Sequence, residues 1–140
     1  MSGVLVDTDV LVVACRAGRG DPRADKAKAV LENLARLGNG FVSVQNLAEF
    51  SRVVRSRVES PASSSKVREA VAQLEQVFDV LRPSSRTVSH ALHSVEKHGL
   101  PFWDSMVWAV AHENGIDEVL TDDLPSRPQI EGVRYRNPFA

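Results

Sequence analysis

Apolar residues follow two alternating patterns along this chain. Short continuous runs, typical of strands buried on both faces of a sheet, predict strands at 3–6, 41–44, 78–81, 119–121 and 133–136. Longer runs with apolar positions three and four residues apart predict helices at 10–15, 24–37, 45–58, 67–77, 85–99 and 102–114. Strands that alternate with helices imply crossover connections. We therefore expect an α/β fold, with a mostly parallel sheet of four to five strands and helices on both faces.

Several residues mark where these elements begin, end and face inward. Thr8 or Asp9 is predicted to cap the first helix, because a short side-chain oxygen satisfies free N–H groups there. Residues 59–65 (ESPASSS) are predicted to form a loop, and Val58 is predicted to face inward from the helix before it. In the helix at 85–99 we expect an apolar face made of Val88, Ala91, Leu92 and Val95.

Length and composition narrow the class of protein. The 140 residues suit one domain spanning 1–140, large enough to bury a core without disulfide bonds. Cys15 is the single cysteine, which excludes an internal disulfide framework and a cysteine-based zinc site. The net charge of −1 argues against a strongly basic nucleic-acid sleeve and a polybasic membrane binder. Neither a signal peptide nor a membrane-spanning run is visible, so we expect a cytoplasmic protein without membrane contact.

Acidic residues interrupt apolar stretches at four places. They are Asp7 and Asp9 within VLVDTDVLVV, Glu49 within VQNLAEF, Asp104 within PFWDSMVWAV, and Asp122 and Asp123 after VLT. An unpaired carboxylate among buried side chains is costly, so a sequence rarely keeps one there without a partner. Three of the four places lie at or just beyond the carboxyl end of a predicted strand, where parallel sheets bind ligands. Asp104 joins them if its helix begins at the same edge.

Four converging carboxylates call for a hard cation. Mg²⁺ or Mn²⁺ prefers oxygen ligands, usually meets a phosphate substrate, and can activate water for attack on a phosphodiester. The competing interpretation is structural, because Glu49 and Asp104 near helix N-termini would be stabilised by the helix dipole without any metal. For all four acids together we favour the functional interpretation.

The same segments resemble the four acidic motifs of the PIN-domain family, in order: VDTDVLV, QNLAEF, FWDSMVWAVAHENG and VLTDDL. The closing stretch IEGVRYRNPF resembles the tail of bacterial PIN proteins of the VapC toxin type. The resemblance runs from Val4 to Phe139. It implies a single PIN-like domain with Mg²⁺- or Mn²⁺-dependent endoribonuclease activity on RNA, commonly the toxin of a toxin–antitoxin pair.

The resemblance also assigns roles to residues of this chain. The catalytic and metal-binding acids that it implies are Asp7, Glu49, Asp104 and Asp123. Thr121, in the T-x-D pattern, would be a hydroxyl neighbour of the site, and Thr8 would be another.

This sequence departs from the commonest family pattern in two places. Asp9 stands where Asn is frequent, and Asp122 stands where Glu is frequent. Each adds negative charge and is an additional candidate metal ligand. The fourth acid is therefore either Asp122 or Asp123, and we favour Asp123.

Basic and aromatic residues near these acids have two interpretations each. Arg52 and Arg55 follow Glu49 on one predicted helix, and Arg52 shares its face. They would contact RNA phosphates, or they would form a salt bridge with Glu49 or a solvated surface. Trp103 and Trp108 could stack on bases, but we expect them to pack in a buried helix.

Two protein partners are expected. The resemblance implies a homodimer whose acidic sites face a shared groove. The helix at 24–37 has more apolar face than a monomer of this size needs, so we expect it to supply apolar contact in that dimer. The antitoxin that the resemblance implies would offer an extended basic tail, with an Arg or Lys reaching the acids.

Two other functions remain open at this point. DTDV also resembles the D-x-D opening of haloacid-dehalogenase phosphatases, in which Asp7 would be the nucleophile. That class needs a lysine before its last acidic pair, and no lysine follows Lys97. The other alternative is a non-catalytic PIN-like domain that binds RNA or protein without cutting.

Overall fold

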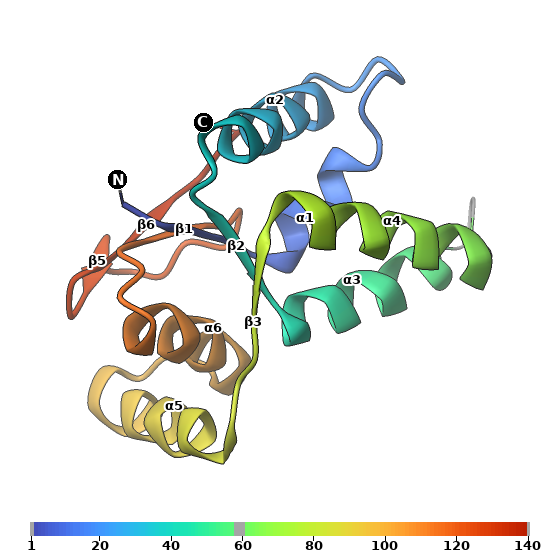
Figure 1. Ribbon diagram of the computed structural model, residues 1–140. Coiled ribbons are helices and arrows are strands. Elements are labelled where there is room, and N and C mark those ends of the chain that lie inside the picture. Colours follow the sequence, from blue (N-terminus) through green and yellow to red (C-terminus); the bar gives the residue numbers. More distant parts are fainter. Residues whose placement is uncertain (1, 58–60, 140) are drawn as a thin grey trace.

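The chain folds as a sheet with helices on both sides, and the computed structural model in Figure 1 describes residues 2–57 and 61–139. The strands are β1 (Val4–Val6), β2 (Gly40–Ser43), β3 (Asp79–Leu81), β4 (Glu118–Leu120), β5 (Gln129–Ile130) and β6 (Val133–Arg136). The helices are α1 (Thr8–Ala14), α2 (Pro22–Leu37), α3 (Val44–Arg55), α4 (Ser64–Val77), α5 (Ser85–His98) and α6 (Phe102–Glu113). Each predicted strand and helix is present, with small shifts at the ends.

The strand order is β3-β2-β1-β4-β6-β5, and every neighbouring pair except β5–β6 is parallel. This confirms the mostly parallel α/β architecture, but the described residues form six strands and not four or five. The strand that we did not predict, β5, has two residues and runs antiparallel to β6. Glu131 and Gly132 turn the chain between them with φ values of 47° and 86°. A two-residue strand has too few positions to show an apolar pattern.

The helices form two layers. Figure 1 places α1 to α4 on one side of the sheet and α5 and α6 on the other. Val4 and Val6 belong to the core under α1 to α4, whereas Leu5 belongs to the core on the α5 and α6 side. Successive side chains of a strand point to opposite faces, so the three residues of β1 contribute to both cores.

The ends of two helices differ from the prediction. Asp7 caps α1, and neither Thr8 nor Asp9 does: the Asp7 carboxylate accepts a hydrogen bond from the Thr8 N–H at 2.8 Å. Residues 64 and 65 of the predicted loop form the start of α4, which Ser63 caps. Residues 58–60, and with them the predicted inward side chain of Val58, lie outside the described part of the chain.

The predicted inner face of α5 is wrong in part. Ala91 is buried, but Val88 and Leu92 are 38% and 51% exposed. Thr87 and Ser94 are buried with Ala91 instead. Small side chains on this face let α5 pack closely against α6, and their polarity hid the face from a pattern based on apolar residues.

The parallel register brings the carboxyl ends of β1 and β4 together at one edge of the sheet. Val6 pairs with Leu120, and the Asp7 N–H donates to the Leu120 carbonyl at 2.9 Å. Asp7 and Thr121, which follow these strands, therefore lie beside each other. No helix in the described part of the chain is long and apolar enough to cross a membrane.

Candidate active site

Asp7 is fixed by the end of β1 and the beginning of α1. Its backbone extends the sheet pairing to β4, and its side chain caps α1 through the Thr8 N–H. Both constraints act within one residue, so the carboxylate has little freedom to move. It lies mostly buried at the sheet edge where the predicted acids were expected to meet.

Asp9 ties the loop after β4 to α1. Its Oδ2 atom accepts hydrogen bonds from the Thr121 hydroxyl at 3.2 Å and from the Asp122 N–H at 2.9 Å, and its Oδ1 accepts from the Val10 N–H at 2.8 Å. The Thr121 hydroxyl oxygen in turn accepts from the Asp123 N–H at 3.1 Å. The Thr121 hydroxyl therefore links the Asp9 carboxylate to the backbone that carries Asp123.

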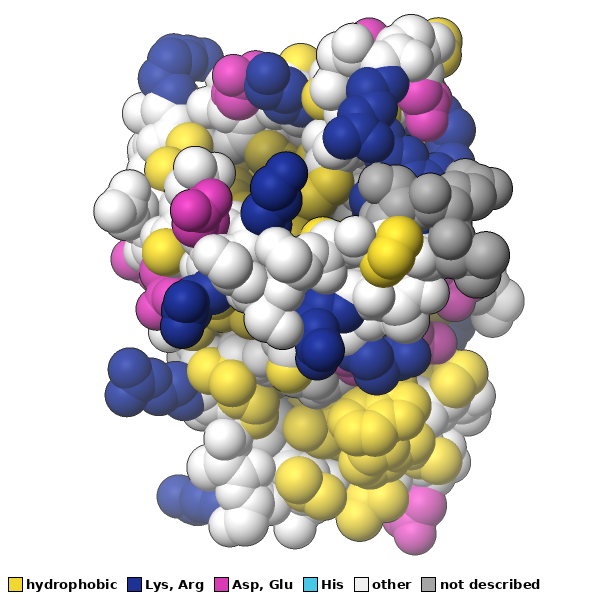
Figure 2. All heavy atoms as spheres, turned by 90° about the vertical axis from the view of Figure 1, so that its right-hand side faces the viewer, with side chains coloured by type: hydrophobic (Ala, Val, Ile, Leu, Met, Phe, Trp, Pro, Cys, Tyr) yellow, Lys and Arg dark blue, Asp and Glu magenta, His cyan; other side chains and the backbone are white. Residues whose placement is uncertain are grey.

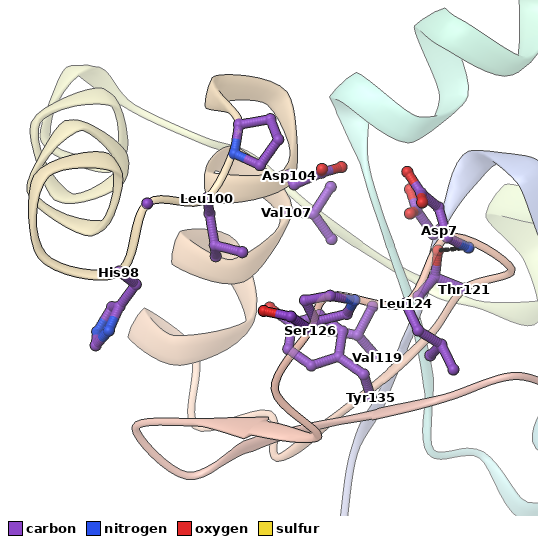
Figure 3. A pocket seen from close by; sticks show the side chains of 14 residues that line it. Asp7, His98, Leu100, Asp104, Val107, Val119, Thr121, Leu124, Ser126 and Tyr135 are labelled. Carbon is purple, nitrogen blue, oxygen red and sulfur yellow. Dashed lines mark hydrogen bonds between the residues drawn. The ribbon is translucent and has the colours of Figure 1, made fainter.

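Asp104 approaches the same place from the other side of the sheet. It lies in the first turn of α6, and its side chain lines one pocket together with Asp7 and Asp123. Figure 3 shows the Asp104 and Asp7 carboxylates across this pocket from each other, on α6 and after β1. The condition set by the sequence, that the helix of Asp104 begins at the strand ends, is met.

Glu49 reaches the site through Thr8. The Thr8 hydroxyl is 3.4 Å from Glu49 Oε2, and Gln45 Nε2 donates to Glu49 Oε1 at 3.0 Å. Glu49 is not among the residues that line the pocket with Asp7, but it lies near enough to Asp104 for their charges to interact. Thr8 is thus a hydroxyl neighbour that links two of the predicted acids.

Asn46 supports this arrangement, and the sequence analysis missed it. It is fully buried, and its Nδ2 lies 3.3 Å from the Thr8 hydroxyl oxygen and 3.5 Å from Asp7 Oδ1. Its Oδ1 accepts from the Ser43 N–H at 3.1 Å and from the Ser43 hydroxyl at 2.9 Å. The available signal was the pair of polar residues Ser43 and Asn46, spaced as a capping box ahead of the apolar Leu47.

Burial and mutual repulsion act on the acids together. Burial first, and then the charge of Asp9, raise the pKa of Asp7 to about 7. Burial also raises the pKa of Asp104, with added repulsion from Asp123, Asp9 and Glu49. The pKa of Asp9 is raised as well, again chiefly by burial. Acids that disfavour one another's ionised form in this way mark a site where negative charge is concentrated.

The side chains of Asp122, Arg52 and Arg55 are not among those that line the acidic pocket. Asp122 is exposed, and its carboxylate pairs with Arg23 at 2.6 Å and accepts from Asn137 at 3.3 Å. Arg52 and Arg55 are exposed on α3, beside a shallow hollow, and within residues 2–57 and 61–139 no salt bridge joins either of them to an acid. The salt bridge of Arg52 with Glu49, one of the interpretations left open by the sequence, is therefore absent from the described residues.

The acids fit a divalent cation in donor type and charge. Their side chains offer oxygen ligands, which Mg²⁺ and Mn²⁺ prefer. Burial first, and then repulsion between the acids, raises the pKa values of Asp7 and Asp104, and a bound cation would favour the ionised carboxylates. In the part of the chain that the structure describes, no three His, Cys, Asp or Glu side chains stand close enough together to hold an ion without rearrangement.

Comparison with known proteins gives a family and a set of similar folds. Residues 4–124 match the family described as the PIN domain. No curated protein matches the chain. Among solved structures, a toxin–antitoxin complex from Klebsiella pneumoniae is 16% identical, with a TM-score of 0.71 over 98% of this chain and 98% of that chain.

Two further structures have the same fold. The toxin VapC20 of Mycobacterium tuberculosis, described as cleaving the sarcin–ricin loop, is 20% identical with a TM-score of 0.62, over 84% of this chain and 87% of that one. A DNA-bound VapBC from Salmonella typhimurium is 15% identical with a TM-score of 0.66, over 99% of both chains. At these identities the likeness establishes the fold.

Proposed function

The chain belongs to the PIN-domain family, and from this premise we propose that it is a metal-dependent endoribonuclease, the toxin of a toxin–antitoxin pair. The observation that carries the proposal is the meeting of Asp7, Asp104 and Asp123 in one pocket, with Glu49 linked to them through Thr8. Four separate segments of the sequence supply these four acids. A purely structural use at helix N-termini accounts for Asp7, which caps α1, and for Asp104 in the first turn of α6, but it leaves Asp123 in the pocket without a role.

Each acid has a proposed part. The metal-binding and catalytic acids are Asp7, Glu49, Asp104 and Asp123. When bound, Mg²⁺ or Mn²⁺ would supply activation of water and stabilisation of the leaving oxygen. Asp123 is favoured over Asp122 as the fourth acid, because the Asp122 carboxylate is engaged with Arg23. The chief proposed part of Asp9 is to hold the loop after β4 by accepting a hydrogen bond from the Asp122 N–H. Its charge also raises the pKa of Asp104.

RNA would reach the acids across the face that Figure 2 shows. Lys and Arg side chains lie across the middle of this face, at the level where Figure 1 places α3. Arg52 and Arg55 are exposed on that helix without an ion pair among the described residues, so they are available to RNA phosphates.

The direct test is cleavage of RNA that contains unpaired segments. We expect cleavage to stop in EDTA and to return with excess Mg²⁺ or Mn²⁺, and Asp7→Asn to abolish it. Asp21→Asn is the matched control, because Asp21 caps α2 with its side chain but is not among the residues that line the acidic pocket. Cleavage that survives EDTA would refute the metal dependence. Folded protein that binds RNA but never cuts it would favour the non-catalytic alternative.

We also propose a homodimer, on the evidence of exposed apolar side chains. Leu92 on α5 and Trp103 on α6 are 51% and 61% exposed, and Trp103 adjoins Asp104. The prediction that Trp108 packs in the core is confirmed, whereas the same prediction for Trp103 is wrong. Figure 2 shows hydrophobic side chains gathered at the lower end of the molecule, where Figure 1 places these two helices.

The expected dimer surface thus differs from the one proposed on sequence. The apolar residues of α2 pack largely against the core, so α5 and α6 offer the larger exposed apolar side chains. A dimer joined there would bring two acidic sites toward one groove. Light scattering at micromolar concentration should give twice the mass of the chain. A monomer would contradict a stable interface, which should bury over ~1,000 Å².

The antitoxin is proposed to use the acids themselves. An extended basic tail with an Arg or Lys reaching the Asp7 and Asp104 carboxylates would form charge-assisted hydrogen bonds there and compete with the cation. Growth should be inhibited when the chain is expressed alone and restored when the neighbouring small open reading frame is expressed with it. Harmless overexpression of the wild-type chain would contradict the toxin role and leave ribonuclease activity to be judged separately.

A further inference from the structure

The pocket that holds the acids continues away from them. It has a volume of about 250 Å³, and Asp7, Asp104 and Asp123 line only part of it. The remainder is lined by apolar side chains of Leu100, Val107 and Val119 and by the ring of Tyr135. Figure 3 shows these side chains grouped beside the acids, from α6, β4, β6 and the segment that precedes α6. The site therefore has an acidic part and an apolar part in one continuous space.

The wall of the apolar part is held rigidly. His98 lines it, and both of its ring nitrogens are engaged: Nε2 lies 2.6 Å from a Glu131 carboxylate oxygen and Nδ1 lies 2.5 Å from an Arg127 guanidinium nitrogen. The His98 side chain is also only 8% exposed. The imidazole is thus a fixed surface and not a group available to a ligand.

Two hydroxyls of the pocket are available. Among the residues that the structure describes, neither the Tyr135 phenol nor the Ser126 hydroxyl has a hydrogen-bond partner, although both residues line the pocket. Burial, with the negative charges of Asp104 and Asp7, raises the pKa of Tyr135, so the phenol keeps its proton and can donate. Because the charges of Asp104 and Asp7 contribute to this higher pKa, the phenol lies close to the acidic part of the pocket.

We propose that the apolar part of this pocket is a subsite for one unpaired nucleobase beside the phosphate that is cut. The inference rests on the proposed ribonuclease function and names the part of the substrate that the site recognises. Apolar and aromatic surfaces take the faces of a base, while hydroxyls read its edge. The whole pocket, with its acidic part, has a volume of about 250 Å³, below the 300–1,000 Å³ usual for drug-sized ligands, so its apolar part suits a single base. A base within a duplex cannot turn into such a pocket without unstacking, so the substrate is single-stranded or looped RNA.

The test is a comparison of cleavage sites in a pool of RNA with a randomised unpaired loop. Sequencing of the product ends should show that the wild-type chain prefers one base at one position beside the cut. Tyr135→Phe and Ser126→Ala should each lower that preference by about fivefold, the factor that corresponds to one neutral hydrogen bond. Both changes are small, and circular dichroism checks that the variants are folded.

A blocking variant tests the space itself. Ser126 is exposed at the pocket, so Ser126→Tyr places a ring there without disturbing the core, and it should lower cleavage at preferred sites by about tenfold or more. Ser65→Tyr is the matched control, because Ser65 is also exposed but lies on α4 and outside the pocket. This control should cut as the wild type does.

The outcomes separate the two proposals. Cleavage without base preference, or with a preference that Tyr135→Phe, Ser126→Ala and Ser126→Tyr leave unchanged, overturns the subsite while the ribonuclease stands. If Ser126→Tyr abolishes inhibition by a partner protein but not base preference, the pocket belongs to that partner and the subsite is overturned. A wild-type chain that cuts no RNA overturns the proposed function and the subsite with it.

Discussion

Replacing Asp7 with asparagine should stabilise the protein while removing its activity. The pKa of Asp7 is raised from 3.8 to about 7, chiefly by burial and by the charge of Asp9. The ionised carboxylate is therefore less favourable in the folded chain than in the unfolded chain. The pKa difference corresponds to about 4 kcal/mol at a pH where Asp7 is ionised in both states.

The sign of the pH dependence follows from this difference. Below pH 3.8 Asp7 carries its proton in both states and contributes nothing. Between 3.8 and about 7 the unfolded chain releases the proton while the folded chain keeps it, so the free energy of unfolding falls as pH rises. Above about 7 the cost is complete. The raised pKa values of Asp9 and Asp104 act in the same direction.

Urea unfolding of the wild type and Asp7→Asn, with EDTA present, measures this contribution. Asparagine still caps a helix, so α1 should persist. The variant should be more stable than the wild type by roughly 2–4 kcal/mol at pH 8, and the difference should vanish toward pH 3.8. Asp21→Asn, at the N-cap of α2, controls for the loss of an acidic cap. A wild-type stability that does not fall with pH, or a variant less stable than the wild type at pH 8, would refute the reasoning.

Three further experiments test separate parts of the structure. Asn46→Ala removes buried hydrogen bonds beside the acids and should lower the free energy of unfolding by about 1–3 kcal/mol, measured in urea. Trp103→Glu combined with Leu92→Glu should convert the dimer to a monomer in light scattering, whereas an unchanged mass would place the interface elsewhere. Arg52→Ala and Arg55→Ala should each lower the slope of log affinity for RNA against log salt by about 0.7, and an unchanged slope would make both arginines solvated surface.

The sequence was sufficient to predict the positions of those acids that directly follow an apolar run. Asp7 ends an apolar run and Asp123 follows another, so their place at the sheet edge required only the inference of parallel strands. Asp104 required one further condition, the direction of α6, which the structure meets. Spacing does not distinguish Asp122 from Asp123 as the proposed fourth acid. Their side chains differ in the structure because Asp122 pairs with Arg23, 99 residues earlier.

The residues that sequence reasoning missed are fixed by contacts between distant segments. Asn46 is buried where α3 packs against the start of α1, and its amide contacts Thr8, 38 residues earlier in the chain. Tyr135 reads as one position of a final strand. It enters the pocket because β6 pairs with β4, where Tyr135 is opposite Val119. That pairing is a property of the sheet order, which no local pattern encodes.

Asp9 connects the acidic part of the site with the part proposed to bind a base. It accepts three hydrogen bonds, and two of them hold the chain at Thr121 and Asp122. The loop that leaves from there carries Asp123 and then Ser126, which line the two parts of the same pocket. An aspartate at this position can accept from all three donors, whereas an asparagine turns an N–H donor toward at least one of them. The commonest family pattern has Asn at this position. In this chain the charged Asp9 instead holds the loop that carries Asp123 and Ser126, and this loop contributes to both parts of the site.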